Sequence, residues 1–287
     1  MNDYLIITDS SCDLEASFAK ELGVKVIKLE FIVEGEEARA NDSVDEKQFY
    51  EILRSGKMVT TSAIAMDRFV SEVEPYLADG KDILYLGFSS GLSSTYHAGS
   101  LGAQELSEKY PERKIYTVDT LCASLGQGLL VYLAAKLRLE GKSIEDVRDF
   151  VEQSKLHLCH WFTVDDLFFL KRGGRVGAAT AVVGTMLGIK PVMHVDNKGK
   201  LVKVTTARGR RASIDALAAK VGEAGIDPAD QTMFICHGDC AEDAEYLAAK
   251  LKNDYGVKEV IIGYTGVVIG SHSGPGTLAL FFIGTNR

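Results

Sequence analysis

The sequence predicts an α/β protein in which helices flank a mostly parallel sheet. Short apolar runs typical of buried strands alternate with longer segments of helical composition. Hydroxyl-bearing or acidic residues recur where these strands end, at 8–11, 89–95 and 119–120. Because ligands of such sheets bind beyond the carboxyl ends of the strands, these polar segments are expected to border a binding crevice.

The length of the chain indicates two domains. Its 287 residues, 46% of them hydrophobic, suffice for two cores of ordinary size. The composition of the sequence changes near Leu158, after which basic and glycine-rich turns become frequent. We therefore expect an N-terminal α/β domain over 1–158 and a second α/β domain, with a mixed sheet, over 159–287.

The first half contains most of the strand–helix alternation. Leu14, Phe18 and Leu22 follow each other at four-residue spacing, which predicts a helix. Ser143 and Asp146 fit a capping box that starts another helix. Strands are expected at 4–7, 24–33, 83–86 and 114–118, and further helices at 44–55, around 69–77, at 96–110 and at 122–140.

The second half has a different composition. A short helix is expected at 165–170, before a basic turn at 171–175. The segments 191–195 and 200–206 predict a hairpin. Residues 266–276 predict a glycine-rich loop around His272, where the backbone could approach a ligand closely. The remaining elements are expected as strands at 232–236, 258–264 and 278–283 and as helices from Ile214 and at 241–254.

Charge and composition exclude some classes of function. The formal net charge of −8 argues against general nucleic-acid binding. The first residues have no basic region typical of a signal peptide, and no apolar run approaches the ~18 residues that span a bilayer. Five cysteines, odd in number and scattered, fit reduced thiols. We therefore expect a cytoplasmic protein.

The segment 82–96 is the most informative part of the sequence. A buried strand leads through residues 87–95, with five hydroxyls and two glycines, into a helix. The free amides and the dipole of a helix N-terminus favour an anion, and hydroxyl groups can donate to the same oxygens. Simple capping of the helix by these serines explains the segment about equally well.

A serine hydrolase is one alternative. Residues 87–91 match G-x-S-x-G after a strand, and Ser89, Asp239 and His272 follow in the order of an α/β-hydrolase triad. This alternative leaves the hydroxyl clusters at 8–11 and 60–62 unexplained, and the sequence has no HGGG-type oxyanion loop.

Metal-dependent chemistry has weaker support. Asp9, Asp119 and Asp239 each follow a strand and could bind magnesium in a phosphotransferase, but helix capping explains them as well. A phosphotransferase working through His272 is a third possibility. One cluster of Cys236, His237 and Cys240 is a poor match to structural zinc. We expect no metal and no cofactor.

Taken together, the motifs resemble the DegV family of bacterial fatty-acid-binding proteins, which includes the FakB subunits of fatty acid kinase. The resemblance implies a two-domain fold that holds one long-chain fatty acid, such as palmitate, stearate or oleate, in a tunnel between the domains. The segments that carry it, in family order, are 8–11, 61–62, 89–96, 167–175, 207–211 and 270–276.

The resemblance also implies roles for individual residues. The carboxylate of the fatty acid would be bound by Thr61, Ser62, Ser93 and His272, with Ser94 as a further candidate ligand. Supporting positions in the same loops are Asp9, Ser10, Ser11, Ser90, Thr95 and Gly270. Three departures from the family motifs, Ile64, Ala65 and Ser94, leave the acyl-chain preference open.

By the same resemblance the protein is a carrier and not an enzyme. It would present the carboxylate to a separate ATP-dependent kinase, and lipid exchange could involve transient contact with a membrane surface. Arg172, Arg175 and Arg208, in the two basic turns, are the expected contacts for the kinase.

Hydroxyls and an imidazole, with no fixed arginine expected among them, neutralise a carboxylate only partly. Affinity must then come mainly from the tail. About 14 methylenes at ~0.8 kcal/mol each contribute on the order of 11 kcal/mol before ordering costs. The expected tunnel residues are Phe168, Phe169, Val182, Met186, Leu187, Ile189, Phe281 and Phe282.

Overall fold

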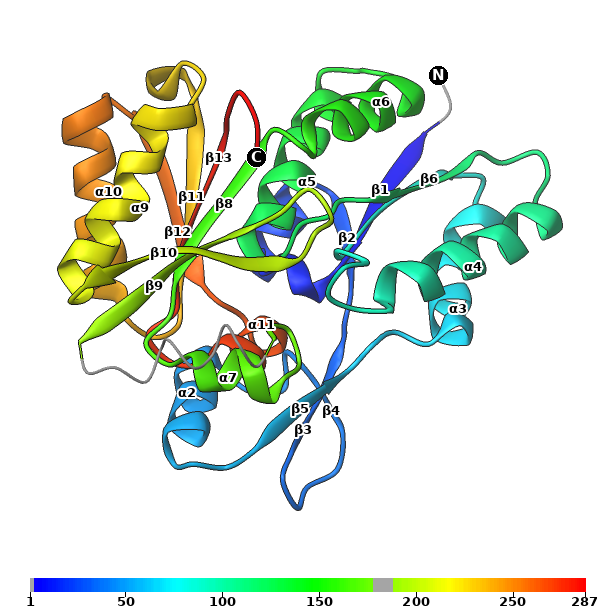
Figure 1. Ribbon diagram of the computed structural model, residues 1–287. Helices are drawn as coiled ribbons and strands as arrows, with labels where there is room; N and C mark the ends of the chain where they lie inside the picture. Colours follow the sequence, from blue (N-terminus) through cyan, green and yellow to red (C-terminus); the bar gives the residue numbers. More distant parts are fainter. Residues whose placement is uncertain (1–2, 178–187) are drawn as a thin grey trace.

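The computed structural model describes residues 3–177 and 188–287 (Figure 1). Two larger sheets and one small sheet organise this part of the chain. The first sheet is wholly parallel, in the order β2-β1-β6-β7. Its strands are β1 (Tyr4–Asp9), β2 (Val24–Ile27), β6 (Asp82–Gly87) and β7 (Ile115–Asp119).

Helices cover both faces of this parallel sheet. Ile7, Ile83 and Tyr85 face α3 and α4, whereas Ile6 and Leu84 face α5 and α6. Alternate strand residues therefore enter two different cores, which is why the strands have no polar side. The four helices are α3 (Met66–Ala78), α4 (Thr95–Lys109), α5 (Ser124–Leu139) and α6 (Ile144–Ser154).

The second sheet is mixed, in the order β10-β9-β8-β13-β11-β12. Only β11 and β12 run parallel, and the other described pairs are antiparallel. Helices α9 and α10 pack on one face and α5 on the other. The elements are β8 (Leu158–Thr163), β9 (Ile189–Val195), β10 (Leu201–Arg208), α9 (Arg210–Ala224), η3 (Pro228–Asp230), β11 (Thr232–His237), α10 (Ala241–Tyr255), β12 (Glu259–Tyr264) and β13 (Leu278–Ile283).

Helix α5 therefore lies between the two larger sheets, as Figure 1 shows. It is buried over most of its length, and its residues share one hydrophobic core with strands of both sheets. Because this core is common to both halves, α5 determines how the halves sit against each other. The boundary at 158/159 stays a prediction.

A third, small sheet was not expected from the sequence. The expected strand at 24–33 is wrong as a single element, because it divides into β2 and β3 (Glu30–Val33), which join different sheets. β3 pairs with β4 (Arg39–Ala40) and β5 (Val59–Ser62), in the order β4-β3-β5. This sheet packs with α2 (Glu46–Arg54). The predicted hydroxyl cluster at 60–62 thus lies on a strand.

The glycine-rich segment at 266–276 is also not the loop that was expected. Residues Val267–Ser273 form helix α11, and only Gly274 onward forms a turn. Gly274 has φ +79, and Gly270 lies so close to the Tyr50 hydroxyl that an added Cβ would come within 2.6 Å of it. The glycines that suggested a loop therefore serve close packing and helix termination.

Several local predictions agree with the structure. The capping box at Ser143 is present, with the Ser143 side chain accepting from the Asp146 amide. The predicted hairpin is β9–β10, with an irregularity between Lys203 and Thr205. The predicted first helix is shorter than expected, because the 3₁₀-helix η1 (Ser10–Cys12) precedes α1 (Ala16–Glu21). The short helix near 165–170 is α7 (Leu167–Arg172). The α/β class with a parallel and a mixed sheet is confirmed.

Candidate functional site

A cavity of about 320 Å³ lies where the two halves meet. This volume falls at the lower end of the roughly 300–1,000 Å³ typical of small-molecule sites. Its walls come from β5, the loop 88–94 between β6 and α4 (the serine loop), the start of α5, α11, and the inner face of the mixed sheet. The cavity thus draws on elements that are far apart in sequence.

One part of the cavity wall gathers the predicted carboxylate ligands. Thr61 and Ser62 from β5, Ser93 and Ser94 from the serine loop, and His272 from α11 all line it. Thr61 Oγ1 and His272 Nε2 lie 2.8 Å apart, in hydrogen-bond contact. Ser94 is exposed, which places it at the open side of the cavity.

The serine loop is held by local hydrogen bonds. Ser93 Oγ lies 2.9 Å from Thr95 Oγ1 and accepts from the Thr95 amide at 3.1 Å. Ser90 is tied by its amide to the Asp119 carboxylate at 3.2 Å. The Ser93 hydroxyl therefore accepts from the first amide of α4 and also lines the cavity, so capping and binding are compatible.

Asp9 joins the loops that follow β1 and β6. Its buried carboxylate accepts from the Phe88 amide at 2.9 Å, the Ser11 amide at 3.1 Å and the Tyr85 hydroxyl at 3.1 Å. Burial raises the pKa of Asp9, while these hydrogen bonds oppose that shift. Asp9 does not line the cavity, so its contribution is to hold the loops in place.

The other supporting residues are also structural. Ser10 Oγ accepts from the Leu29 amide at 2.9 Å, and Ser11 is fully buried. Gly270 provides the close approach of α11 to Tyr50 described above. Of the six supporting positions, Thr95 is the one that lines the cavity.

His272 is enclosed by its neighbours. A Cβ added to Gly173 would come within 2.4 Å of His272 Nδ1, so only glycine leaves room for the ring on that side. Burial lowers the pKa of His272 to about 4, helped by the positive charges of Arg175 and Arg172. The imidazole is therefore neutral near pH 7, with Nε2 directed at Thr61.

Arg175 corrects the expectation that no arginine stands near the carboxylate site. Its half-buried side chain lines the cavity, and its Nε donates to the Leu92 carbonyl at 3.3 Å. A second guanidinium nitrogen donates to the Gly173 carbonyl. Burial lowers the pKa of Arg175, but an arginine keeps its charge near neutral pH. The site therefore includes a fixed cation.

The proposed hydrolase triad is not assembled. Ser89 is fully buried, and its Oγ donates to the Gly199 carbonyl at 2.8 Å. Asp239 forms an ion pair with Arg54, and His272 contacts Thr61 instead. The G-x-S-x-G match is thus a loop that packs on the β9–β10 hairpin, and the serine has no general base.

The residues weighed as possible metal ligands have hydrogen-bond partners within the protein. Asp119 accepts from the Ser90 and Leu121 amides, as a loop cap would. The Cys236 sulfur accepts from the hydroxyls of Ser124 and Thr265. Among residues 3–177 and 188–287, no three His, Cys, Asp or Glu side chains form a group that could hold a metal ion.

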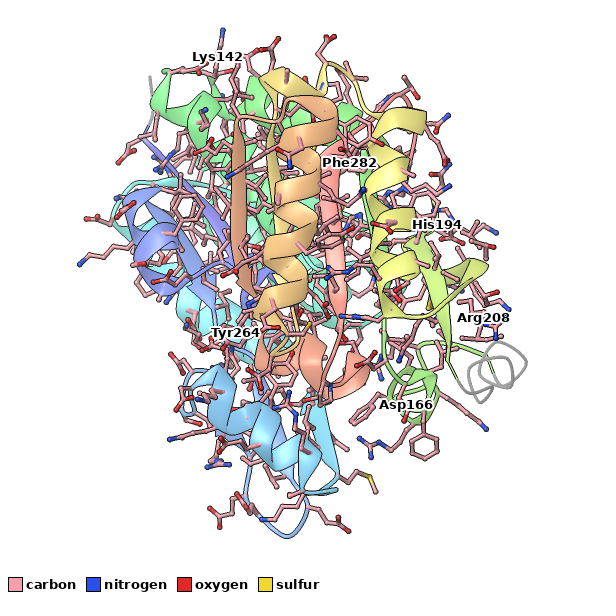
Figure 2. The ribbon with its side chains drawn as sticks, turned by 90° about the vertical axis from the view of Figure 1, so that its left-hand side faces the viewer. Lys142, Asp166, His194, Arg208, Tyr264 and Phe282 are labelled. Carbon is pink, nitrogen blue, oxygen red and sulfur yellow. The ribbon has the colours of Figure 1, made fainter. Side chains whose placement is uncertain are left out.

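The rest of the cavity wall is largely apolar. It includes Phe88, Leu92, Phe162, Leu170, Leu201 and Phe281. Of the expected tunnel residues that the structure describes, Phe281 is the one that lines the cavity. Its neighbour Phe282 points to the opposite face of the sheet, where α9 and α10 cover it (Figure 2), because side chains alternate along a strand.

The other expected tunnel residues lie elsewhere. The Phe168 side chain is 55% exposed, and Phe169 packs against Gly274 and Arg172. Ile189 is not part of the cavity wall. Val182, Met186 and Leu187 lie outside the described residues.

Four hydroxyl-bearing residues of the cavity wall, together with His160, were not predicted as site residues. Ser124, Thr265, Ser273 and Thr277 each contribute a polar side chain to the wall. Ser124, Thr265 and Thr277 are single hydroxyls next to glycine or alanine with no motif of their own, whereas Ser273 belongs to the segment 270–276 but was not singled out. The helical periodicity of α11 could have pointed to Ser273, had the segment been recognised as a helix.

Across the described residues, no helix combines the length and the hydropathy that crossing a bilayer requires.

Comparison with known proteins gives a consistent result. A family model described as "Uncharacterised protein, DegV family" matches residues 4–285. A DegV domain-containing protein of Clostridium perfringens is 44% identical over 289 residues, covering 100% of this chain and 99% of the relative. Another, from Streptococcus pyogenes, is 35% identical over 285 residues, covering 99% of each chain.

Solved structures are similar over the same length. The fatty-acid-binding DegV family protein of Thermus thermophilus matches with a TM-score of 0.86 and 29% identity, covering 97% of this chain and 98% of the other. DegV of Bacillus subtilis, a fatty acid binding protein, matches with a TM-score of 0.84 and 27% identity, covering 98% and 99%. Sequence, fold and coverage agree, and the chain belongs to the DegV family.

Proposed function

We propose that this protein binds one long-chain fatty acid in the cavity between its halves, with the carboxylate held by Thr61, Ser62, Ser93, Ser94 and His272. The observation that carries the proposal is the composition of the cavity wall, where these five side chains accompany a largely apolar surface. The fatty-acid-binding relatives of known structure support it.

The carboxylate is bound mainly by neutral donors. Hydroxyl groups donate to its oxygens, and the neutral imidazole of His272 donates through Nε2 when Nδ1 is unprotonated. Arg175 supplies the positive charge that hydroxyls lack, and hydrogen bonds or ion pairs that involve a charged group are about twice as strong as neutral ones. The head group is therefore held by charge and geometry together.

The tail supplies most of the binding free energy. Burying about 14 methylenes contributes on the order of 11 kcal/mol before the costs of ordering are subtracted. Phe88, Phe162, Phe281 and the leucines of the wall provide the apolar surface. Tight binding is thus compatible with a ligand that is later passed on.

The protein acts as a carrier that presents the carboxylate to a separate acyl kinase. Arg172 and Arg208 are the proposed docking contacts. Arg208 is exposed at the end of β10, and Figure 2 places it on the same side as Asp166, which begins α7. One Arg172 nitrogen has no hydrogen-bond partner among the described residues, and it can donate to an acidic group of a bound protein. The carrier works in the cytoplasm, with transient membrane-surface contact for exchange of lipid.

The binding step is tested by extracting the purified protein with organic solvent and analysing the extract by mass spectrometry. A long-chain fatty acid is expected at up to one equivalent per chain. Delipidated protein should take up palmitate or oleate and gain about 2.7 kcal/mol of stability at a free concentration of 100 Kd. If no acid is extracted and none is taken up, the proposal is wrong.

The presentation step is tested with a fatty acid kinase, ATP and the loaded protein. Acyl phosphate should form only when both proteins are present. Arg172→Glu and Arg208→Glu should lose phosphorylation but keep their fatty acid. Lys142→Glu, at the opposite end of the molecule in Figure 2, is the matched control and should remain active.

A further inference from the structure

Ser273, on α11, carries a buried hydroxyl group. Its side chain lines the cavity and the residue is only 5% exposed. Within the described part of the chain, its Oγ has no hydrogen-bond partner. A buried hydroxyl without a partner is destabilising, so such a group in the wall of a ligand site points to a polar atom of the ligand as its partner.

The helix places Ser273 beside the carboxylate ligands and not among them. On α11 the cavity is lined by Val268, Ile269, His272 and Ser273. At 3.6 residues per turn, Val268 and His272 form one row, and Ile269 and Ser273 form the next. The row of His272 faces Thr61, and the row of Ser273 is turned about 100° further around the helix.

Other hydroxyls of the cavity wall have partners in the protein. Thr277 donates to the Gly274 carbonyl at 2.8 Å, and Thr265 to the Cys236 sulfur at 3.1 Å. The Ser124 hydroxyl contacts the Asp13 carboxyl and the same sulfur. These groups give the wall a polar character outside the carboxylate site, but among them Ser273 alone has unused donor and acceptor capacity in the described structure.

An unsubstituted alkyl chain would leave the Ser273 hydroxyl buried and unpaired. The carboxylate already has Thr61, Ser62, Ser93, Ser94, His272 and Arg175 around it. Since a carboxylate offers about four acceptor positions, it does not need a further hydroxyl. The unused hydroxyl instead matches a second oxygen on the ligand.

We propose that the cavity takes an acyl chain that carries a second oxygen, as in a hydroxy or oxo fatty acid, and that Ser273 is its hydrogen-bond partner. This inference rests on the proposed function and names a class of ligand for the same cavity. Ser273 then discriminates between oxygenated and plain chains, because a site built to pair a buried polar group penalises a ligand that lacks the partner.

The test measures equilibrium binding of stearate and of 3-, 10- and 12-hydroxystearate to delipidated protein. One hydroxylated isomer should bind about fivefold more tightly than stearate, as expected for one net hydrogen bond. Ser273→Ala should remove that advantage without weakening stearate binding, because a plain chain no longer buries an unpaired hydroxyl in the variant. Ser271→Ala is the matched control, because Ser271 is on the same helix but donates to the Val267 carbonyl at 2.7 Å.

Three results would overturn the inference. One is that no hydroxylated isomer binds wild-type protein better than stearate, which needs no variant. Another is that Ser273→Ala weakens stearate and hydroxystearate equally, which would make Ser273 a carboxylate ligand. In both cases stearate still binds and the proposed function stands. If wild-type protein binds none of the four acids, the proposed function fails and this inference fails with it.

Discussion

At the scale of single residues, His272 illustrates how burial sets the state of a binding group. The ring is enclosed between Gly173 and Thr61, and its pKa is lowered to about 4 by burial and by Arg175 and Arg172. The imidazole is therefore a neutral hydrogen-bonding group at the pH of a cell. Its Nε2 pairs with the Thr61 hydroxyl and, in the tautomer protonated at Nε2, can donate to a carboxylate instead.

We predict that His272 of the ligand-free protein does not titrate between pH 5 and pH 8. Its ring-proton NMR signal, assigned by its loss in His272→Gln, should stay constant over this range. On binding of palmitate the pKa should rise, because a nearby carboxylate favours the imidazolium. A midpoint near 6.5 in the ligand-free protein would contradict the proposed burial.

The pKa of Asp13 is raised by burial, whereas that of His272 is lowered. Burial raises the pKa of this carboxyl to about 8, while the Ser124 hydroxyl opposes the shift. In the unfolded chain an aspartate releases its proton near pH 3.9. The folded protein therefore binds more protons between these values, and this group lowers the free energy of unfolding as the pH rises from about 4 to 8.

Asp13→Asn should flatten this part of the stability–pH profile. The amide is always neutral, so it cannot be charged at high pH. Urea denaturation at pH 5, 6.5 and 8 measures the effect, with the exposed Asp227 as the matched control in Asp227→Asn. Equal slopes in wild type and Asp13→Asn would show that Asp13 is ionised throughout.

Arg175 supplies the charge of the site. Arg175→Ala should weaken palmitate binding by roughly 10-fold or more, the scale of a lost charge-assisted hydrogen bond. Palmitate methyl ester has no negative charge, so its binding should change much less. Lys171→Ala, at an exposed position of the same basic turn, is the control. Equal losses for acid and ester would indicate that Arg175 only shapes the wall.

At the scale of elements, the β9–β10 hairpin and the serine loop form one packed unit. Ser89 donates to the Gly199 carbonyl, and a Cβ on Gly91 would come within 2.4 Å of the Lys198 carbonyl oxygen. Both neighbours are backbone atoms, which cannot turn aside as a flexible side chain can. The hairpin of the C-terminal half thus holds the loop that presents Ser93 and Ser94.

Gly91→Ala should therefore destabilise the protein by about 1–3 kcal/mol, as overpacking usually does. It should also weaken palmitate binding, because the serine loop must move. Gly177→Ala is the control, since an added Cβ there meets none of the described atoms within 4 Å. Unchanged stability in urea would mean that the hairpin is free to move away from the loop.

At the scale of the whole molecule, α5 links the two larger sheets through a common core. Val118 of the parallel sheet and Phe281 of the mixed sheet belong to the same buried cluster as α5. Losing either sheet would expose one side of this helix to water. The cavity is a consequence of the same arrangement, because its walls come from both halves.

We predict that the chain unfolds in one cooperative transition. Circular dichroism and the fluorescence of Trp161, the single tryptophan, should report the same urea midpoint. Trp161 lies on β8 of the mixed sheet, so it reports on the second half, whereas circular dichroism reports on both. Two separate midpoints would mean that the halves are independent and that α5 stays with one of them.

Most of the strands and helices could be predicted from the sequence. Apolar runs and four-residue spacings are local patterns, and the Ser143 capping box depends on only four residues. The predictions failed where one local sequence pattern is compatible with two different structures. The run at 24–33 divides between two sheets, and the glycines of 266–276 pack a helix closely instead of forming a loop.

By itself, the sequence determined the fold class, the order of most elements and the resemblance to DegV proteins, because periodicity and short motifs are carried by neighbouring residues. Only the tertiary structure decided which face of β13 borders the cavity, that Arg175 stands beside His272, and that the Ser273 hydroxyl has no partner within 3–177 and 188–287. These facts depend on contacts between residues far apart in the chain. Burial and charge at such contacts are properties of the packed molecule, and no local pattern records them.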